Sequence, residues 1–195
     1  VGIYGNTAIA GAQFDDDNGY QAGSAYLFDS NNGQLIVKLL PDDGIAEDRF
    51  GISVAVGESV AIVGAINDDD NGTDSGSAYI FDIITGQQIA KLLPDDGEAS
   101  DRFGISVAVS GTTVIVGSYL SNNDGLRSGA AYVFDISDPA NPVQSGKIIA
   151  SDRESSDYFG QAVAVSGYHA AVGAYQDDDN GDASGSAYIY NLDCD

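Results

Sequence analysis

Three short acidic segments contain the residue types best suited to chemistry in this 195-residue chain. A hard cation takes roughly six to eight oxygen ligands, and closely spaced carboxylates, Asn and backbone carbonyls surround it where Gly allows a sharp turn. Each segment has three aspartates before Asn-Gly, so we predict Ca²⁺ binding there. A solvated loop is the alternative, because Asp-Asn-Gly is ordinary turn chemistry. The segments are Asp15-Asp16-Asp17-Asn18-Gly19, Asp68-Asp69-Asp70-Asn71-Gly72 and Asp177-Asp178-Asp179-Asn180-Gly181.

A further acidic set, Pro41-Asp42-Asp43-Gly44 with Asp48, recurs as Pro94-Asp95-Asp96-Gly97 with Asp101. Each set directly precedes Arg-Phe-Gly. Asp-Gly turns and Asp–Arg pairs would tie neighbouring units together at these places. We therefore expect a structural role, with cation binding as the alternative.

The only histidine, His169, follows Tyr168, and such a pair could act as a general acid and base. A single residue that the other copies do not repeat more often has a surface or packing role than a catalytic one. The sequence contains no nucleophile elbow, phosphate-binding loop, paired-cysteine motif or HExxH sequence, so we expect no enzymatic activity. Cys194 is the only cysteine, which excludes an internal disulfide and leaves an intermolecular disulfide or a free thiol.

The overall composition is strongly acidic but is also that of a folded protein. The chain has 30 Asp and Glu against 7 Lys and Arg, a formal charge of −23, and this surface would repel nucleic acid and anionic membranes. The 43% content of hydrophobic residues favours a packed core over disorder. No apolar run approaches the roughly 20 residues that span a bilayer, and no signal peptide is visible. We expect one globular domain, with no membrane insertion.

Internal repetition decides the architecture that positions the acidic segments. Gly11, Gly64, Gly117 and Gly173 recur at intervals of 53, 53 and 56 residues, and each begins a copy of a similar segment. The longest interval contains an enlarged turn at 138–142. Downstream of each glycine stands a second repeated segment, and the four are GSAYLFD (23–29), GSAYIFD (76–82), GAAYVFD (129–135) and GSAYIYN (185–191).

Each copy is predicted to form four β-strands. In the second copy these are about Ile52–Val56, Val60–Ala65, Ser77–Asp82 and Gln87–Leu93, and no segment has helical periodicity of sufficient length. Four-stranded repeats of about this size are typical of propeller blades, which bury their faces by stacking around an axis. We predict an all-β propeller of four four-stranded blades with repeats of about 53 residues, the last lacking its outer strand. The single domain covers 1–195, with approximate repeats 1–49, 50–102, 103–158 and 159–195.

Phe-Gly pairs indicate a known family. Phe50-Gly51, Phe103-Gly104 and Phe159-Gly160 precede predicted strands, and thirteen residues later stand Gly64-Ala65, Gly117-Ser118 and Gly173-Ala174. This pattern resembles the FG-GAP repeat of integrin α-subunit propellers and of many bacterial surface and secreted proteins. The likeness covers essentially the whole chain. The third GAP position is never Pro here, the first copy has no Phe-Gly, and the family usually closes seven blades.

The resemblance implies calcium in the loop between the second and third strands of a blade, with oxygen ligands at alternating positions. In the second copy Asn67, Asp69, Asn71 and Ser75 match these positions. Phe14 and Gln176 stand at the position of Asn67 in the first and fourth copies. The third loop, Ser121-Asn122-Asn123-Asp124-Gly125, retains one carboxylate and is the weakest candidate.

We therefore expect an extracellular or cell-surface, non-enzymatic module with a structural or adhesive role, stabilised by Ca²⁺. Because the array lacks one outer strand, its open sheet edge would invite pairing, so self-association into a homo-oligomer or filament is the expected partnership. In the alternative, a three-stranded last blade is protected by Asp193 and Asp195. The alternative functions are a protein- or glycan-recognition domain and a polysaccharide-active enzyme or its ancillary domain.

Overall fold

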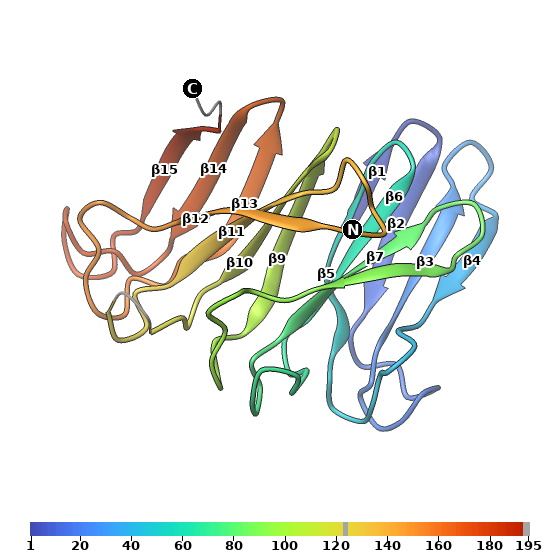
Figure 1. The fold of residues 1–195 in the computed structure, drawn as a ribbon, viewed down its shortest axis with the longest axis horizontal. Coiled ribbons are helices and arrows are strands. Elements are labelled where there is room, and N and C mark those ends of the chain that lie inside the picture. Colours follow the sequence, from blue (N-terminus) through green and yellow to red (C-terminus); the bar gives the residue numbers. More distant parts are fainter. Residues whose placement is uncertain (123–124, 193–195) are drawn as a thin grey trace.

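The computed structural model describes residues 1–122 and 125–192, and this part of the chain consists of strands, turns and loops without a helix (Figure 1). A helix that could cross a membrane is accordingly absent from these residues. Cys194, Asp193 and Asp195 lie outside the described residues. The strands are β1 (Gly2–Tyr4), β2 (Thr7–Ala12), β3 (Ser24–Asp29), β4 (Leu35–Leu39), β5 (Phe50–Val56), β6 (Val60–Ala65), β7 (Ser77–Asp82), β8 (Gln88–Leu92), β9 (Phe103–Ser110), β10 (Thr113–Ser118), β11 (Ala130–Asp135), β12 (Val143–Ile148), β13 (Phe159–Ser166), β14 (His169–Ala174) and β15 (Ser186–Asn191).

The strands form four antiparallel sheets in chain order: β1-β2-β3-β4, β5-β6-β7-β8, β9-β10-β11-β12 and β13-β14-β15. These sheets are the four predicted blades, and the last has three strands within the described residues, as expected. The predicted strands of the second copy are confirmed to within two residues. Its first strand starts earlier than predicted because Phe50 pairs with Ala65 across a register shift that ends at Ser53.

Burial along the second strand of each blade reflects how many of its faces are covered. Every residue of β6 is buried, because blades lie on both of its sides. In β14 buried residues alternate with more exposed ones, because the described residues cover only one face of the fourth blade. The continuous apolar segment Val60–Ala65 is therefore that of a strand covered on both faces.

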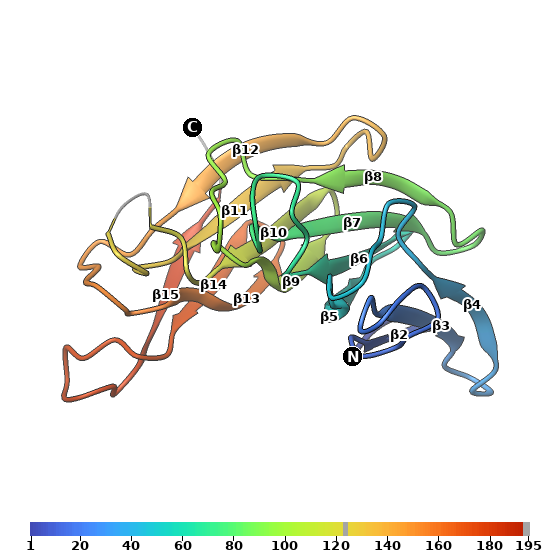
Figure 2. The ribbon, with the colours of Figure 1, turned by 90° about the horizontal axis from the view of Figure 1, so that it is seen from below.

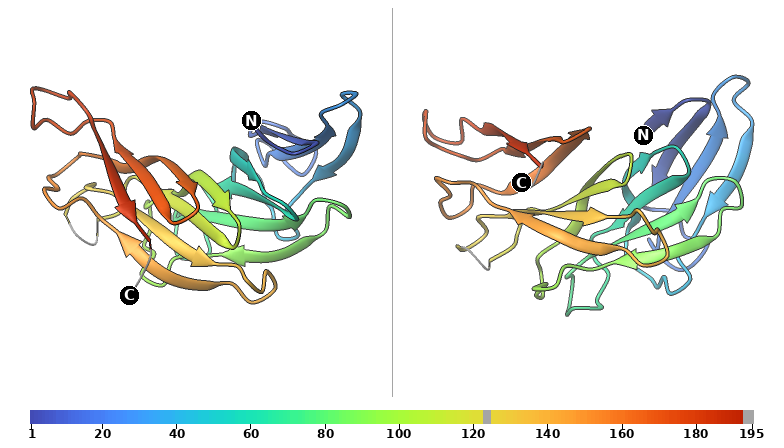
Figure 3. Two further views of the ribbon diagram at one scale, coloured as in Figure 1. Left: turned by 90° about the horizontal axis from the view of Figure 1, so that it is seen from above. Right: turned by 45° about the horizontal axis from the view of Figure 1, so that its top comes forward.

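The blades stand side by side as an open arc, with the first and fourth blades at its two ends (Figures 2 and 3). Neighbouring blades contact each other through their first strands, because β5 meets β1, β9 meets β5 and β13 meets β9. The outer strands β4, β8 and β12 lie at the periphery. The four sheets do not close into a ring.

One hydrophobic core fills each of the three spaces between neighbouring blades. The phenylalanine of each Phe-Gly pair is fully buried in such a core. Phe50 packs edge-on against Tyr79 and Phe81, with ring centroids 5.5 and 5.7 Å apart. Edge-on pairs of this kind add stability beyond burial of their area. Phe103 and Phe159 repeat the arrangement in the next two blades.

Candidate cation-binding loops and blade contacts

A lysine ammonium lies among the carboxylates of the second acidic loop. The Nζ atom of Lys91, on β8, is 2.8 Å from Asp68 and 2.6 Å from Asp70. It also contacts Asp43, from the connection between blades, at 2.8 Å. The hydroxyl of Tyr79 donates to Asp68 at 2.7 Å. The Asp68 side chain is only 6% exposed, so its charge depends on this lysine.

The titration of the pair reflects the same contacts. Burial raises the pKa of Asp68, but hydrogen bonds from Lys91, Ser77 and Tyr79 outweigh it and leave the pKa below its ordinary value. Burial lowers the pKa of Lys91, but the hydrogen bonds that it donates to carboxylates raise it overall. Both groups are therefore charged at neutral pH.

The first acidic loop is built in the same way. Lys38, on β4, contacts Asp15 at 3.1 Å and Asp17 at 2.5 Å, and Tyr26 donates its hydroxyl to Asp15 at 2.8 Å. A hydrogen bond from the backbone N–H of Asp17 is the largest of the effects that lower the pKa of Asp15 to about 2. In both loops, then, the first and third aspartates converge on one cation.

The second aspartate of the loop has a different role. Asp16 accepts the backbone N–H of Gln21 at 2.7 Å, and Asp69 accepts that of Asp74 at the same distance. Gln21 and Asp74 have left-handed backbones, with φ of 51° and 58°. These carboxylates therefore close the loop and do not join Asp15 or Asp68 at the lysine.

The asparagines connect the loops to other segments. Asn18 and Asn71 donate their side-chain amides to the carbonyls of Gly44 and Pro94, in the connection between blades. Asn67 donates to the carbonyl of Glu47 and accepts a hydrogen bond from Arg102. The structure thus places Asn67 against the neighbouring connection, away from the aspartates that meet Lys91.

The fourth acidic loop has the same carboxylates in a different electrostatic setting. Asp177 is buried and accepts hydroxyl hydrogen bonds from Ser186 at 2.9 Å and Tyr188 at 2.7 Å. Tyr188 also lies 2.8 Å from Asp152, which stands where Asp43 does in the second blade. The charge of Asp177 is the main cause that raises the pKa of Asp179.

We call Asp152, Asp177 and Asp179 the fourth-blade acid cluster. Within the described residues, no Lys or Arg forms an ion pair with any of the three, whereas Lys38 and Lys91 fill the equivalent places in the first two blades. Asp178 and Asn180 are exposed. The carboxylates of the fourth loop therefore lie together without an ion pair to a lysine or arginine among the described residues.

The third loop departs from the others. Ser121 replaces the first aspartate, and Asn123 and Asp124 lie outside the described residues. Lys147, on β12, contacts Asp96 at 2.8 Å. The lysine is thus present in the third blade, although serine stands in place of the first aspartate of the loop.

The acidic side chains of the described residues do not form a ready-made metal centre. Across the described ranges, no group of three or more Asp, Glu, His or Cys side chains is arranged to hold a metal ion. The first and third aspartates nevertheless meet one lysine in each of the first two loops, and Asp177 and Asp179 stand at the same positions in the fourth. A bound Ca²⁺ would take Asp177 and Asp179 in the fourth blade, and would compete with a lysine in the first two.

The sequence interpretation missed the lysines. Their signal was available, because Lys38, Lys91 and Lys147 each stand 12 residues before the phenylalanine of a Phe-Gly pair. Each lysine lies opposite a tyrosine across the ladder between the third and outer strands: Lys38 faces Tyr26, Lys91 faces Tyr79 and Lys147 faces Tyr132.

The Phe-Gly and Gly-Ala motifs meet between blades. A Cβ on Gly64 would lie 2.0 Å from the carbonyl oxygen of Gly104 in the next blade, and a Cβ on Gly76 would lie 2.1 Å from that of Phe103. Phe103 also donates its N–H to the Ser75 carbonyl at 2.9 Å. The glycines are therefore required by the close approach of the following Phe-Gly segment. Gly11, Gly23, Gly117 and Gly129 repeat the contact.

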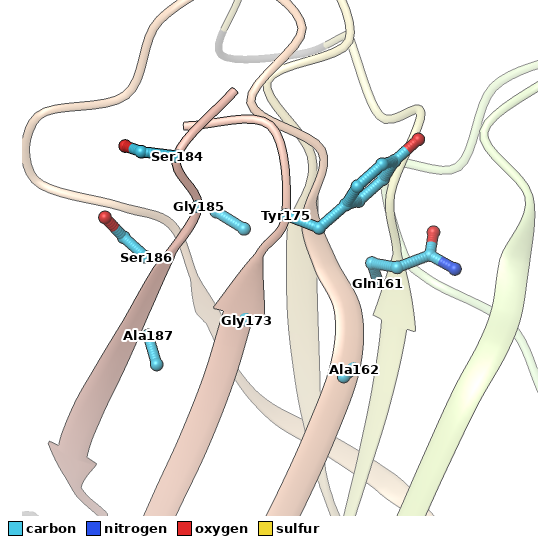
Figure 4. A pocket seen from close by; sticks show the side chains of 9 residues that line it. Gln161, Ala162, Gly173, Tyr175, Ser184, Gly185, Ser186 and Ala187 are labelled. Carbon is cyan, nitrogen blue, oxygen red and sulfur yellow. The ribbon is translucent and has the colours of Figure 1, made fainter. Parts of the chain in front are cut away.

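At the fourth blade the corresponding place is an open pocket of about 460 Å³, lined by residues of β13, β14 and the start of β15 (Figure 4). A Cβ on Gly173 would be 3.7 Å from its nearest neighbour, the Cβ of Ala162, and among the described residues no Phe-Gly segment lies against it. We call this the fourth-blade pocket. Its lining residues are Gln161, Ala162, Gly173, Ala174, Tyr175, Ser184, Gly185, Ser186 and Ala187.

The FG-GAP repeat family matches residues 1–28, 34–81, 87–134 and 142–190, so the chain belongs to this family. Each of the three later matches begins with an outer strand and ends within the third strand of the next blade. No curated protein matches the chain.

Two solved structures with similar folds are those of computationally designed proteins. The Ika8 protein is 16% identical with a TM-score of 0.57, and the match covers 97% of this chain and 44% of that chain. The Ika4 protein is 18% identical with a TM-score of 0.58, covering 98% of this chain and 88% of that chain. This chain thus spans less than half the length of the Ika8 chain. At these identities the likeness concerns the fold alone.

Proposed function

We propose that this chain is a non-enzymatic structural or adhesive FG-GAP module that acts outside the cell and self-associates through its two end blades. The observation that carries the proposal is that the end faces of the arc match the two sides of the contacts between its own blades. The resemblance to surface and secreted FG-GAP proteins supports the extracellular setting.

The outward face of the first blade is aromatic. In β3, Ala25 and Leu27 point into the core shared with the second blade, so Tyr26 and Phe28 point outward. Ile3, beside them on the same sheet, is 68% exposed. Tyr79 and Phe81 present the equivalent pair from the second blade to the first. Within the arc, each later blade packs its aromatic face against the blade before it. The first blade exposes the corresponding aromatic face.

The outward face of the fourth blade is flat and made of small apolar residues. Its exposed members include Ala162, Ala164 and Ala187. Ile189 is 71% exposed, whereas Ile80, its equivalent in the second blade, is fully buried against the third blade. Inside the arc, the aromatic face of the next blade packs on a surface of this kind.

Two different faces that fit each other give a head-to-tail contact between copies, which closes into a ring or continues as a filament depending on the rotation. Burial of the two faces removes exposed apolar area from water at about 25 cal/mol per Å². Self-association would therefore stabilise both ends of the arc.

Sedimentation and electron microscopy test this proposal. We expect assemblies above the 20.1 kDa monomer, and we expect Ile189→Asp and Phe28→Asp each to dissociate them. The control is Ile84→Asp, because Ile84 is 83% exposed in a turn of the second blade away from both end faces. A wild-type monomer at every concentration, or assemblies that survive both face variants, would refute self-association.

We also propose that Ca²⁺ stabilises the module at the acidic loops, most of all at the fourth. Support comes from Asp177 and Asp179, which lie close together without a described cationic side chain. A ligand that binds only the native state raises the melting midpoint, by about 2.7 kcal/mol of stability at 100 times its Kd. We expect added Ca²⁺ to raise the midpoint and a chelator to reverse the rise.

Two controls separate binding from general screening of the −23 charge. NaCl at equal ionic strength should give a smaller rise in the midpoint than Ca²⁺. Asp179→Asn should remove most of the rise that is specific to Ca²⁺. A calcium response equal to that of NaCl would eliminate the calcium proposal.

A further inference from the structure

The turns between the first and second strands of the blades lie at the opposite end of the strands from the acidic loops (Figure 1). One position in these turns is Asn6, Ser59, Thr112 and Tyr168 in the four copies, and its carbonyl always accepts the N–H of the first or second residue after the third strand. All four side chains are exposed. The position is therefore open in the middle blades as well as at the ends of the arc.

Two hollows lie next to each other on this turn surface, at the junctions of the second, third and fourth blades. The first has a volume of about 310 Å³ and lies between the β5–β6 turn, the β9–β10 turn and the segment after β11. The second has a volume of about 400 Å³ and lies between the β9–β10 and β13–β14 turns. Gly111 and Thr112 line both hollows, so we treat them as one feature, the turn groove.

An insertion in the repeat builds one wall of the turn groove. Pro139 belongs to the enlarged turn at 138–142, which the first two copies lack, and it lines the first hollow. Asp138 accepts the N–H of Ala140 at 3.2 Å and the side-chain amide of Asn141 at 2.8 Å, so the turn is braced from within. Insertions that interrupt a regular repeat often belong to a binding face.

The other walls are held by hydrogen bonds between neighbouring segments. Ile136 donates its N–H to the carbonyl of Thr112 at 2.8 Å, and Gly167 donates its N–H to the hydroxyl of Ser110 at 3.1 Å. A Cβ on Gly111 or Gly167 would meet no atom within 4 Å, so the space above both glycines is open. The turn groove is thus preformed, as ligand sites usually are.

The lining of the first hollow combines apolar and hydroxyl groups. Val60 and Ile136 line it as buried apolar residues. Three exposed side chains in the same lining carry hydroxyls, each of which can donate and accept a hydrogen bond. They are Ser59, Thr112 and Ser137. A ligand that fits this lining has an apolar surface with hydroxyl groups around it.

Tyr168 and Glu58 complete the chemistry of the turn groove. Tyr168 lines the second hollow and is 62% exposed, so its ring is available to a ligand. The C–H face of a sugar ring packs on aromatic rings of this kind. Glu58 is the single charged residue in the lining of either hollow, and its carboxylate can accept hydrogen bonds from two sugar hydroxyls. One charge among hydroxyls favours a neutral ligand over an ion.

We propose that the turn groove binds a short neutral oligosaccharide. One sugar ring stacks on Tyr168 in the second hollow, and its neighbour lies in the first hollow with its C–H face toward Ile136 and Pro139. The hydroxyls of the second sugar bond to Glu58. This site gives the module a ligand besides its own copies, and it shares no residue with the end faces proposed above for self-association.

Saturation-transfer NMR with three neutral trisaccharides, maltotriose, cellotriose and chitotriose, provides the test. The method observes the sugar protons, so it works whether or not the protein assembles. We expect saturable binding of at least one of these sugars. Tyr168→Ala should weaken that binding about tenfold because it removes the aromatic anchor, whereas Tyr168→Phe should retain most of it. Glu58→Gln should also weaken binding about tenfold, because a charged acceptor is lost.

Tyr20→Ala is the matched control. Tyr20 is also 62% exposed, but it lies in the first acidic loop at the other end of the strands, so this variant should bind like wild type. Circular dichroism checks that each variant is folded. The proposal fails if none of the three sugars binds saturably, if binding survives both Tyr168→Ala and Glu58→Gln, or if Tyr20→Ala weakens it equally. None of these results bears on self-association, which sedimentation measures separately.

Discussion

At the scale of single residues, glycine and lysine define the blade contacts. Gly64 and Gly173 occupy equivalent positions in β6 and β14, and neither has a left-handed backbone. They differ in what lies opposite: the carbonyl of Gly104 in one case and open space in the other. A steric effect of the neighbouring blade can therefore be measured without a change in backbone strain.

We predict that Gly64→Ala destabilises the protein by about 3 kcal/mol or more, because the new Cβ must displace a buried backbone. Gly173→Ala should change stability by less than about 1 kcal/mol, since it has room and restricts the unfolded chain. Urea denaturation of both variants measures the difference. Equal effects would show that the close approach of the Phe-Gly segment is not the reason for glycine at 64.

Lys91 is the second residue whose removal is informative. We predict that Lys91→Met costs about 3 kcal/mol at pH 7, because it leaves the buried Asp68 carboxylate without its cation. Adding Asp68→Asn should recover part of this loss, since the uncompensated charge is then removed. Denaturation of the two single variants and the double variant measures the coupling, and strict additivity would contradict this account of the pair.

At the scale of strands and blades, exposure differs between the middle and the ends of the arc. β6 and β10 are covered on both faces, whereas β2 and β14 have one uncovered face. β15 also has a free edge in the described part of the chain. Segments with few buried contacts open locally at lower free energy.

We predict a corresponding order of amide hydrogen exchange. The amides of β6 and β10 should exchange most slowly, and those of β15 fastest among the third strands. Mass spectrometry of peptic fragments measures this order on dilute, monomeric protein. Uniform protection across all four blades would contradict it, whereas protection of β15 that rises with protein concentration would support the contact between end faces.

At the scale of the whole molecule, two groups of carboxylates respond to pH in opposite directions. Burial raises the pKa of Asp48 to about 6, and burial also raises the pKa of Asp101. These groups favour the folded state below their unfolded pKa, and that contribution is lost as pH rises through about 6. Asp15, Asp68 and Asp177 have lowered pKa values, so their contribution is present above about pH 4 and is lost on further acidification.

We predict maximal stability near pH 4, with a decline as the pH rises from about 4 to about 6. Asp48→Asn should reduce that decline by up to about 3 kcal/mol, the value of a shift of two pKa units. The amide oxygen can still accept the N–H of Ile45, which now bonds Asp48 at 2.7 Å. Melting curves across pH test this, with the exposed Asp42→Asn as control; a pH profile unchanged by Asp48→Asn would contradict it.

Much of the fold was predictable because its signals are local. The repeated Gly and Phe-Gly positions, the apolar segment Val60–Ala65 and the turn residues indicated four-stranded blades, and the structure confirms them. The acidic loops between second and third strands were also located correctly. The partner of each loop was not predicted, because Lys91 stands 23 residues after Asp68 and reaches it only through the pairing of β7 with β8.

The sequence by itself determined the strand order of one blade and its repetition. The period of the strands and the chemistry of the turns are local properties of the chain, and the 53-residue interval can be read directly from the sequence. Tertiary structure alone decided which carboxylates meet a cation and which close a loop. It also showed that the Phe-Gly segment of one blade rests on the glycines of the blade before it. The physical reason is that both contacts join residues far apart in the chain, and so depend on how the blades stack.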